Sequence, residues 1–116
     1  MIELPENAQL KDFQTYIHAL EKQHGWLDVD LVHNCFLMGE EVGELFKSIR
    51  KYQSYFDEAA KTESASDQAV KKEAVAEELV DVFNYLLAIS NRLEIDFEAA
   101  FKAKNEKNQH RTWEQG

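Results

Sequence analysis

Residues 36–46, FLMGEEVGELF, and residues 75–83, VAEELVDVF, give the clearest indication of the fold of this chain. Apolar side chains recur in both stretches at spacings of three and four residues, which is typical of a helix. Each stretch also carries two carboxylates three residues apart, Glu41 with Glu44 and Glu78 with Asp81. Because a helix projects residues at this spacing from one face, the sequence predicts two helices with paired carboxylates in apolar surroundings.

Packing these two helices together would bring the four carboxylates near one another. Two carboxylates about 4 Å apart repel by roughly 4 kcal/mol at an effective dielectric constant of about 20, so the group needs protons or a cation. A divalent metal that prefers oxygen ligands is the natural occupant. Either motif alone is weak evidence, because an acidic chain places such pairs on its solvated surface by chance. Glu40 and Glu77 point elsewhere on their helices, so we expect them at the surface or outside the ligand shell.

Length and composition suit one compact domain over residues 1–116, with 44% hydrophobic residues. The net charge of -9 argues against a general nucleic-acid binder, whose affinity comes from neutralising phosphates. The N-terminal residues lack the basic and apolar regions of a secretory signal, and the single cysteine, Cys35, cannot form an internal disulfide. A cytoplasmic location without a membrane span is therefore expected, and Cys35 is expected in the core.

Only one proline and four glycines interrupt the periodic apolar pattern, which favours an all-helical chain. Four helices are predicted. They run over about residues 10–24, 29–52, 67–92 and 97–111, with Gly25 ending the first and Asp96 capping the fourth. Residues 53–68 are expected to form a loop or a frayed helix end. The third helix is apolar on more than one face, so we expect part of it to contact another subunit. The predicted fold is an all-α four-helix bundle completed by oligomerisation.

Two further features concern binding. Lys104, Lys107, Asn108 and Arg111 fall on one broad helical face, which is either a solvated surface or a place to hold phosphates. Trp26 could stack on a base, or it could be a core or interface tryptophan.

One histidine stands at a spacing used by metal sites. Glu21 and His24 have the Glu-x-x-His spacing of di-iron helical bundles, but such sites need two of these motifs and two further glutamates. The chain carries one such motif, so this pair is not predicted to bind metal.

In this order, the motifs resemble those of the MazG-like members of the all-α nucleoside triphosphate pyrophosphohydrolases. The resemblance spans about residues 10–113 and rests on E-E-x-x-E at residues 40–44, E-x-x-D at residues 78–81, and their context. That context is Gly25 with Trp26, the run VFNYLL at residues 82–87, Ile95 with Asp96, and the basic face. The sequence departs from the family in the 33 residues that separate Glu44 from Glu78, a longer spacer than usual.

The resemblance implies hydrolysis of a nucleoside triphosphate between its α and β phosphates. We expect this reaction to remove unwanted or modified nucleotides, and the apolar third helix predicts a homodimer or homotetramer. The resemblance also implies Mg²⁺, with Mn²⁺ as an alternative, on Glu41, Glu44, Glu78 and Asp81. One of these carboxylates, or Glu40, would activate the attacking water. The residues expected to contact substrate are Trp26, Asn84, Tyr85, Lys104, Asn108 and Arg111. Alternatives are a phosphoribosyl-ATP pyrophosphohydrolase and a helical regulatory or assembly module without turnover.

Overall fold

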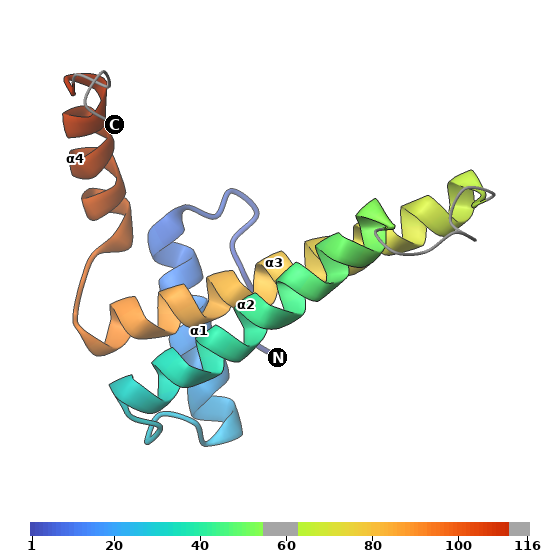
Figure 1. The fold of residues 1–116 in the computed structure, drawn as a ribbon. Coiled ribbons are helices and arrows are strands. Elements are labelled where there is room, and N and C mark those ends of the chain that lie inside the picture. Colours follow the sequence, from blue (N-terminus) through green and yellow to red (C-terminus); the bar gives the residue numbers. More distant parts are fainter. Residues whose placement is uncertain (55–62, 112–116) are drawn as a thin grey trace. The chain divides into compact units, whose positions relative to one another are not determined.

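The chain forms four helices and no strand in residues 1–54 and 63–111, the parts described by this computed structural model (Figure 1). The helices are α1 (Leu10–His24), α2 (Leu31–Gln53), α3 (Ala65–Arg92) and α4 (Phe97–Gln109). The predicted all-α class is confirmed, with helix bounds within two residues of those expected, whereas completion by oligomerisation stays a prediction. Across the described ranges, no helix combines the length and the apolar character needed to cross a membrane.

Aspartates cap the starts of two helices. The Asp30 carboxylate accepts a hydrogen bond from the His33 backbone N–H at 2.7 Å at the start of α2. The Asp96 carboxylate accepts one from the Ala99 N–H at 3.1 Å at the start of α4, which confirms the predicted cap. Both bonds satisfy amides that have no partner inside the first helical turn.

Residues with a left-handed backbone end the first three helices or follow them closely. Gly25 ends α1 with a φ of 74°, Ser54 ends α2 with 58°, and Glu94 follows α3 with 54°. Nothing lies within 4 Å of the place where a Cβ on Gly25 would stand, so its backbone angle, and not crowding, favours glycine there.

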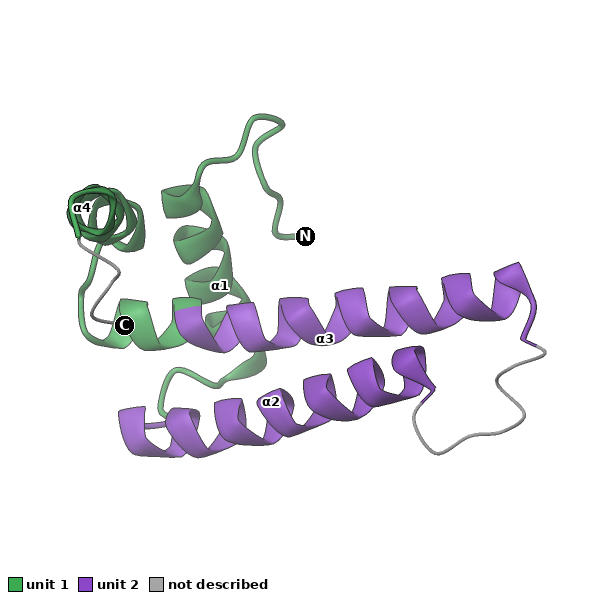
Figure 2. Ribbon diagram, turned by 45° about the horizontal axis from the view of Figure 1, so that its top comes forward, with its two compact units in different colours: residues 1–28, 87–116 green, residues 29–86 purple. Residues whose placement is uncertain are grey.

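The chain divides into two compact units (Figure 2). Unit 1 comprises residues 1–28 and 87–116, with α1, the last turns of α3, and α4. Unit 2 comprises residues 29–86, in which α2 and most of α3 lie side by side in both ribbon views (Figures 1 and 2). The single domain expected from length and composition stays a prediction.

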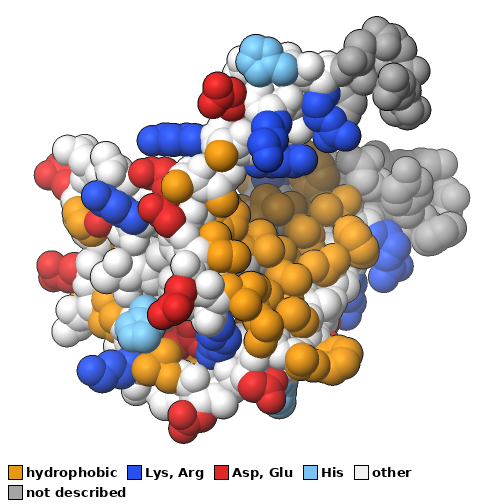
Figure 3. Space-filling model, turned by 90° about the vertical axis from the view of Figure 1, so that its left-hand side faces the viewer, with side chains coloured by type: hydrophobic (Ala, Val, Ile, Leu, Met, Phe, Trp, Pro, Cys, Tyr) orange, Lys and Arg blue, Asp and Glu red, His pale blue; other side chains and the backbone are white. Residues whose placement is uncertain are grey.

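Burial differs between the two units. The buried apolar side chains of the described chain are Ile17, Leu87 and Ala88, all in unit 1. Among the described residues of unit 2, Asn34 alone is buried. Many hydrophobic side chains are exposed, and Figure 3 shows one face of the molecule on which they gather. The described part of the single chain therefore buries few apolar side chains.

Cys35 corrects one prediction, because it is exposed and not in the core. It follows the buried Asn34 directly along α2. Since a helix turns by about 100° per residue, the step from Asn34 to Cys35 carries the thiol away from the inward side. An apolar surrounding in the sequence was not enough to place it.

Gln14 joins three segments of unit 1 with one side-chain amide. Its Nε2 donates to Asn91 Oδ1 at 3.1 Å and to the Ile95 carbonyl at 2.8 Å, while its Oε1 accepts from the Phe97 N–H at 3.0 Å. Asn91 Nδ2 in turn donates to the Gln14 carbonyl at 2.9 Å. These bonds tie α1 to the end of α3 and to the first residue of α4, so they fix where α4 begins within unit 1.

Candidate metal centre

Three carboxylates from two helices meet in unit 2. One oxygen of each of Glu41, Glu78 and Asp81 lies within 4.8 Å of the others. Glu41 comes from α2, whereas Glu78 and Asp81 come from α3 and lie three residues apart, so one face of that helix carries both. Glu41 and Glu78 are half-buried and Asp81 is exposed. The structure thus brings together three of the four carboxylates that the sequence predicted as metal ligands.

The surroundings of Glu41 raise the pKa of its carboxyl group. Its pKa is raised above its ordinary value of 4.5, first because partial burial disfavours the charged carboxylate. The negative charges of Asp81 and Glu78 raise it further, and a hydrogen bond with Glu78 and the charge of Glu44 add to the shift. Two separate causes, desolvation and like charge, therefore oppose the ionised form of Glu41.

The residues fit a hard divalent cation. All three donors are carboxylate oxygens, which are the ligands that Mg²⁺ and Mn²⁺ prefer. One of them, Glu78 Oε2, is buried without a hydrogen-bond partner in the described part of the chain. A buried polar atom normally has a partner, so this oxygen is suited to accept a ligand from outside the protein. A cation at this point would satisfy it and would relieve the repulsion on Glu41.

The remaining acidic residues of the two motifs lie around this cluster. Glu44 is exposed and does not belong to the group of three, although its charge acts on Glu41. Its role as a fourth ligand stays a prediction. Glu40 and Glu77 are exposed, in line with the expectation that they lie at the surface. The described residues offer no further group of this kind.

The predicted substrate contacts are divided between the two units. Asn84 and Tyr85 are half-buried on α3 in unit 2, beyond Asp81. Unit 1 holds Trp26, which follows the end of α1, and the basic face of α4. Lys104 is exposed and Asn108 is half-buried on α4, whereas Arg111 is exposed beyond the end of the helix at Gln109, so the predicted common helical face does not extend to it. The Nδ2 of Asn108 donates to Asn105 Oδ1 at 3.2 Å, while its Oδ1 is buried without a partner in the described chain.

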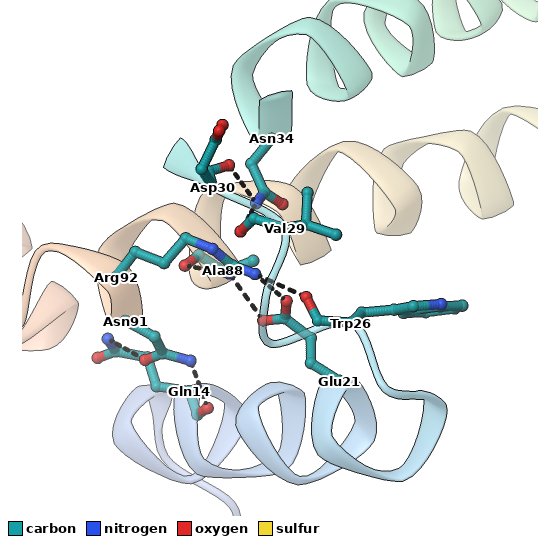
Figure 4. A network of polar contacts seen from close by, with 9 residues as sticks. All are labelled: Gln14, Glu21, Trp26, Val29, Asp30, Asn34, Ala88, Asn91 and Arg92. Atoms are coloured by element: carbon teal, nitrogen blue, oxygen red, sulfur yellow. Dashed lines mark hydrogen bonds and ion pairs between the residues drawn. The ribbon is translucent and has the colours of Figure 1, made fainter. Parts of the chain in front are cut away.

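One set of contacts in unit 1 was not among the predictions made from the sequence. Arg92 at the end of α3 binds the buried Glu21 of α1 and the carbonyl of Trp26 (Figure 4). His24 stacks on the Trp26 ring and does not join a metal group among the described residues. A signal was present, because Glu21 lies four residues after Ile17 on the apolar side of α1, where a charge needs a partner. The identity of that partner, 71 residues away, could not be read from spacing.

The raised pKa of Glu41 predicts how the metal-free protein responds to pH. In the unfolded chain Glu41 should titrate near 4.5, so between that value and the raised pKa the folded protein binds more protons. The contribution of Glu41 to the free energy of unfolding should therefore fall as pH rises through this window. Urea unfolding followed by circular dichroism in a chelator should show this fall in the parent relative to Glu41→Gln.

Glu77→Gln is the matched control, because it removes an exposed charge beside the cluster. This control should keep the pH response of the parent. Added Mg²⁺ at about 100 times its dissociation constant should stabilise the parent by about 2.7 kcal/mol and Glu41→Gln by much less. Equal responses of the parent and Glu41→Gln to both pH and Mg²⁺ would place the metal elsewhere.

Comparison with known proteins identifies a family for this chain. A family model described as MazG nucleotide pyrophosphohydrolase domain matches residues 33–114, more than two thirds of the chain. The matched range includes both acidic motifs and all of α4. No curated protein matches the chain closely enough to serve as a relative. The chain belongs to the MazG nucleotide pyrophosphohydrolase family, as its motifs suggested.

Proposed function

We propose that this protein is a Mg²⁺-dependent nucleoside triphosphate pyrophosphohydrolase. One water molecule would cleave the bond between the α and β phosphates, giving a nucleoside monophosphate and pyrophosphate. The observation that carries the proposal is the meeting of Glu41, Glu78 and Asp81 within 4.8 Å, inside the region matched by the family. The proposed role is removal of unwanted or modified nucleotides, in the cytoplasm as the sequence predicts.

The acidic residues would supply the metal ligands and the group that accepts the proton of the attacking water. Glu41, Glu78 and Asp81 would hold Mg²⁺, or Mn²⁺ in its place, with Glu44 as a fourth ligand. When bound, the ion would neutralise charge on the phosphate oxygens. One of the carboxylates, or Glu40, would orient the attacking water and take its proton. As the new bond to phosphorus forms, the electron pair of the cleaved P–O bond would leave with pyrophosphate.

The basic face of α4 and the aromatic and amide residues would contact the rest of the substrate. Lys104, Asn108 and Arg111 would hold phosphates through charge-assisted hydrogen bonds, on a chain whose net charge is -9. Such a local group of donors is needed, because the chain as a whole repels an anionic ligand. Trp26, Asn84 and Tyr85 would contact the base or the sugar.

Removing one carboxylate of the cluster should abolish turnover. Asp81→Asn keeps the size of the side chain but removes the charge, and Glu41→Gln does the same, so each should weaken Mg²⁺ binding. We expect activity to fall by about 100-fold or more in either variant, with helix content unchanged. The measurement is pyrophosphate release from a panel of nucleoside triphosphates, with and without Mg²⁺.

The exposed Glu77→Gln serves as the control and should keep the activity of the parent. Phosphoribosyl-ATP belongs in the same panel, since selective cleavage of this substrate would favour the related pyrophosphohydrolase. A parent that releases no pyrophosphate from any member of the panel would favour a module without turnover. Full activity of Asp81→Asn would rule out the cluster as the catalytic metal site.

Substitutions on α4 should separate phosphate binding from metal binding. Lys104→Ala should raise the dissociation constant for the nucleotide by about fivefold, which is the effect expected of one exposed charge-assisted bond. The dissociation constant for Mg²⁺ should not change. Lys102→Ala is the matched control, because Lys102 lies on the same helix, is exposed, and pairs with Glu98 at 3.9 Å. Calorimetric titration that finds equal losses in both variants would indicate a general effect of charge.

Exposed hydrophobic side chains support the proposal that the protein works as a homo-oligomer. In unit 2, Phe36, Phe46 and Val70 are each more than 60% exposed, and Leu79 and Val80 more than 50%. Exposed patches of this kind mark interaction sites, and Asn34 alone is buried among the described residues of the unit. A second copy of the chain would cover these side chains, as the sequence predicted for the third helix.

Sedimentation velocity should find a particle of two or four chains, each of 13.5 kDa. Phe36→Ser should shift the equilibrium toward a smaller species, because it removes apolar area that the second copy would cover. Leu4→Ser is the control, since Leu4 is 42% exposed in the N-terminal segment outside unit 2. A parent that sediments as a single chain at all concentrations would contradict the proposal.

A further inference from the structure

Arg92 and Glu21 form a nearly buried ion pair inside unit 1. Arg92 Nη2 lies 2.6 Å from Glu21 Oε2, and Nη1 lies 3.1 Å from Oε1, so the guanidinium meets both carboxylate oxygens. The side chains of Arg92 and Glu21 are 14% and 9% exposed. Paired bonds of this kind fix direction as well as distance, and removing either partner would leave a charge in a poorly solvated place.

The same two residues hold the backbone of Trp26 at both ends. Arg92 Nη2 donates to the Trp26 carbonyl at 3.1 Å, and the Trp26 N–H donates to the Glu21 carbonyl at 2.8 Å. Arg92 Nη1 also donates to the Ala88 carbonyl at 3.1 Å, which anchors the guanidinium to its own helix. Gly25, with its left-handed backbone, allows the chain to turn between Glu21 and Trp26. Figure 4 shows the contacts of Arg92 with Glu21, Trp26 and Ala88.

The ring of Trp26 remains accessible although its backbone is fixed. Trp26 is 51% exposed, and its ring is stacked on the exposed His24 ring with centroids 4.5 Å apart and planes at 20°. His24 takes one face of the indole. The bond from the Trp26 N–H to the Glu21 carbonyl is the usual closing bond of a helix that ends at a left-handed glycine. The bond from Arg92 to the Trp26 carbonyl is additional, and hydrophobic burial does not explain it, because half of the tryptophan surface is open. Holding the open aromatic ring in place would explain this bond, because a fixed ring loses less conformational freedom when it binds a ligand.

We propose that Glu21 and Arg92 are positioning residues that hold the stacked rings of His24 and Trp26 as a platform for a planar aromatic ring. This inference rests on the proposed function, under which the planar ring is the nucleobase. Aromatic side chains bind bases of every kind by stacking, since every base has a π face. The platform would therefore contribute affinity for the base without strong selection among bases.

The test compares two ligands that differ in whether they carry a base. The first is the α,β-imido analogue of each of the four common deoxynucleoside triphosphates, whose bridging nitrogen resists cleavage. The second is inorganic tripolyphosphate, which carries the phosphates alone. Both are titrated with Mg²⁺ into a Trp113→Phe background, so that Trp26 is the single tryptophan. Calorimetry gives the affinities, and quenching of the indole fluorescence reports stacking on Trp26.

Arg92→Gln and Glu21→Gln should each weaken binding of the nucleotide analogues by about tenfold and leave tripolyphosphate binding unchanged. Their double variant should be no worse than either single variant, because both act through one pair. His24→Ala should reduce affinity for the analogues, whereas His24→Phe should keep it. Glu98→Gln, which removes the charge that pairs with the exposed Lys102, is the control and should behave as the parent.

Arg92→Lys is measured beside Arg92→Gln, because it keeps a positive charge next to Glu21 while it cannot reach all the acceptors of the guanidinium. It should fold and still lose several-fold affinity for the analogues. Parent-like affinity of Arg92→Lys, or equal losses for both ligands, would overturn the positioning role. A parent that binds tripolyphosphate as tightly as the analogues would overturn the platform alone, whereas a parent that binds neither would also overturn the proposed function.

Discussion

Repulsion among carboxylates is the constraint on which the candidate site depends. Glu41, Glu78 and Asp81 are brought within 4.8 Å because α2 and α3 lie side by side within unit 2. This repulsion is reflected in the raised pKa of Glu41, and one buried oxygen of Glu78 has no hydrogen-bond partner within the described part of the chain. Residues arranged for stability alone would not leave such a group uncompensated, and local cost of this kind is typical of functional sites. The metal proposal and the chemistry proposed for this protein rest on this cluster, whereas the family is shown by the match over residues 33–114.

Local chemistry allowed much of this structure to be predicted. The spacing of apolar residues indicated the four helices, and Gly25 and Asp96 marked an end and a start because their roles depend on neighbours one to five residues away. The approach of Glu41 to Glu78 and Asp81 could also be inferred, since two apolar helices that carry charges have few ways to pack. Residues 55–62, which are part of the long spacer between Glu44 and Glu78, lie outside the described residues.

What the sequence could not show depends on pairs far apart in the chain. Glu21 with His24 has a metal-ligand spacing, yet in the structure Glu21 meets Arg92 and His24 meets Trp26. No local pattern favours Arg92 over other cations as the partner of Glu21. Cys35 shows the same limit in a simpler form, because one step along α2 separates a buried position from an exposed one. The spacing of residues indicates which side chains share a face of a helix, whereas tertiary packing determines which residues that face contacts.

Because burial differs along α3, the free energy of local opening should also differ along this helix within a single chain. Near its C-terminal end this helix carries Leu87 and Ala88, which are almost fully buried, whereas its described residues before Leu87 include none that is buried. Amide protons exchange with solvent through local opening, whose free energy rises with the apolar contacts that must be broken. One continuous helix should therefore show a gradient of hydrogen exchange, with slow amides around Leu87 and faster ones toward Ala65.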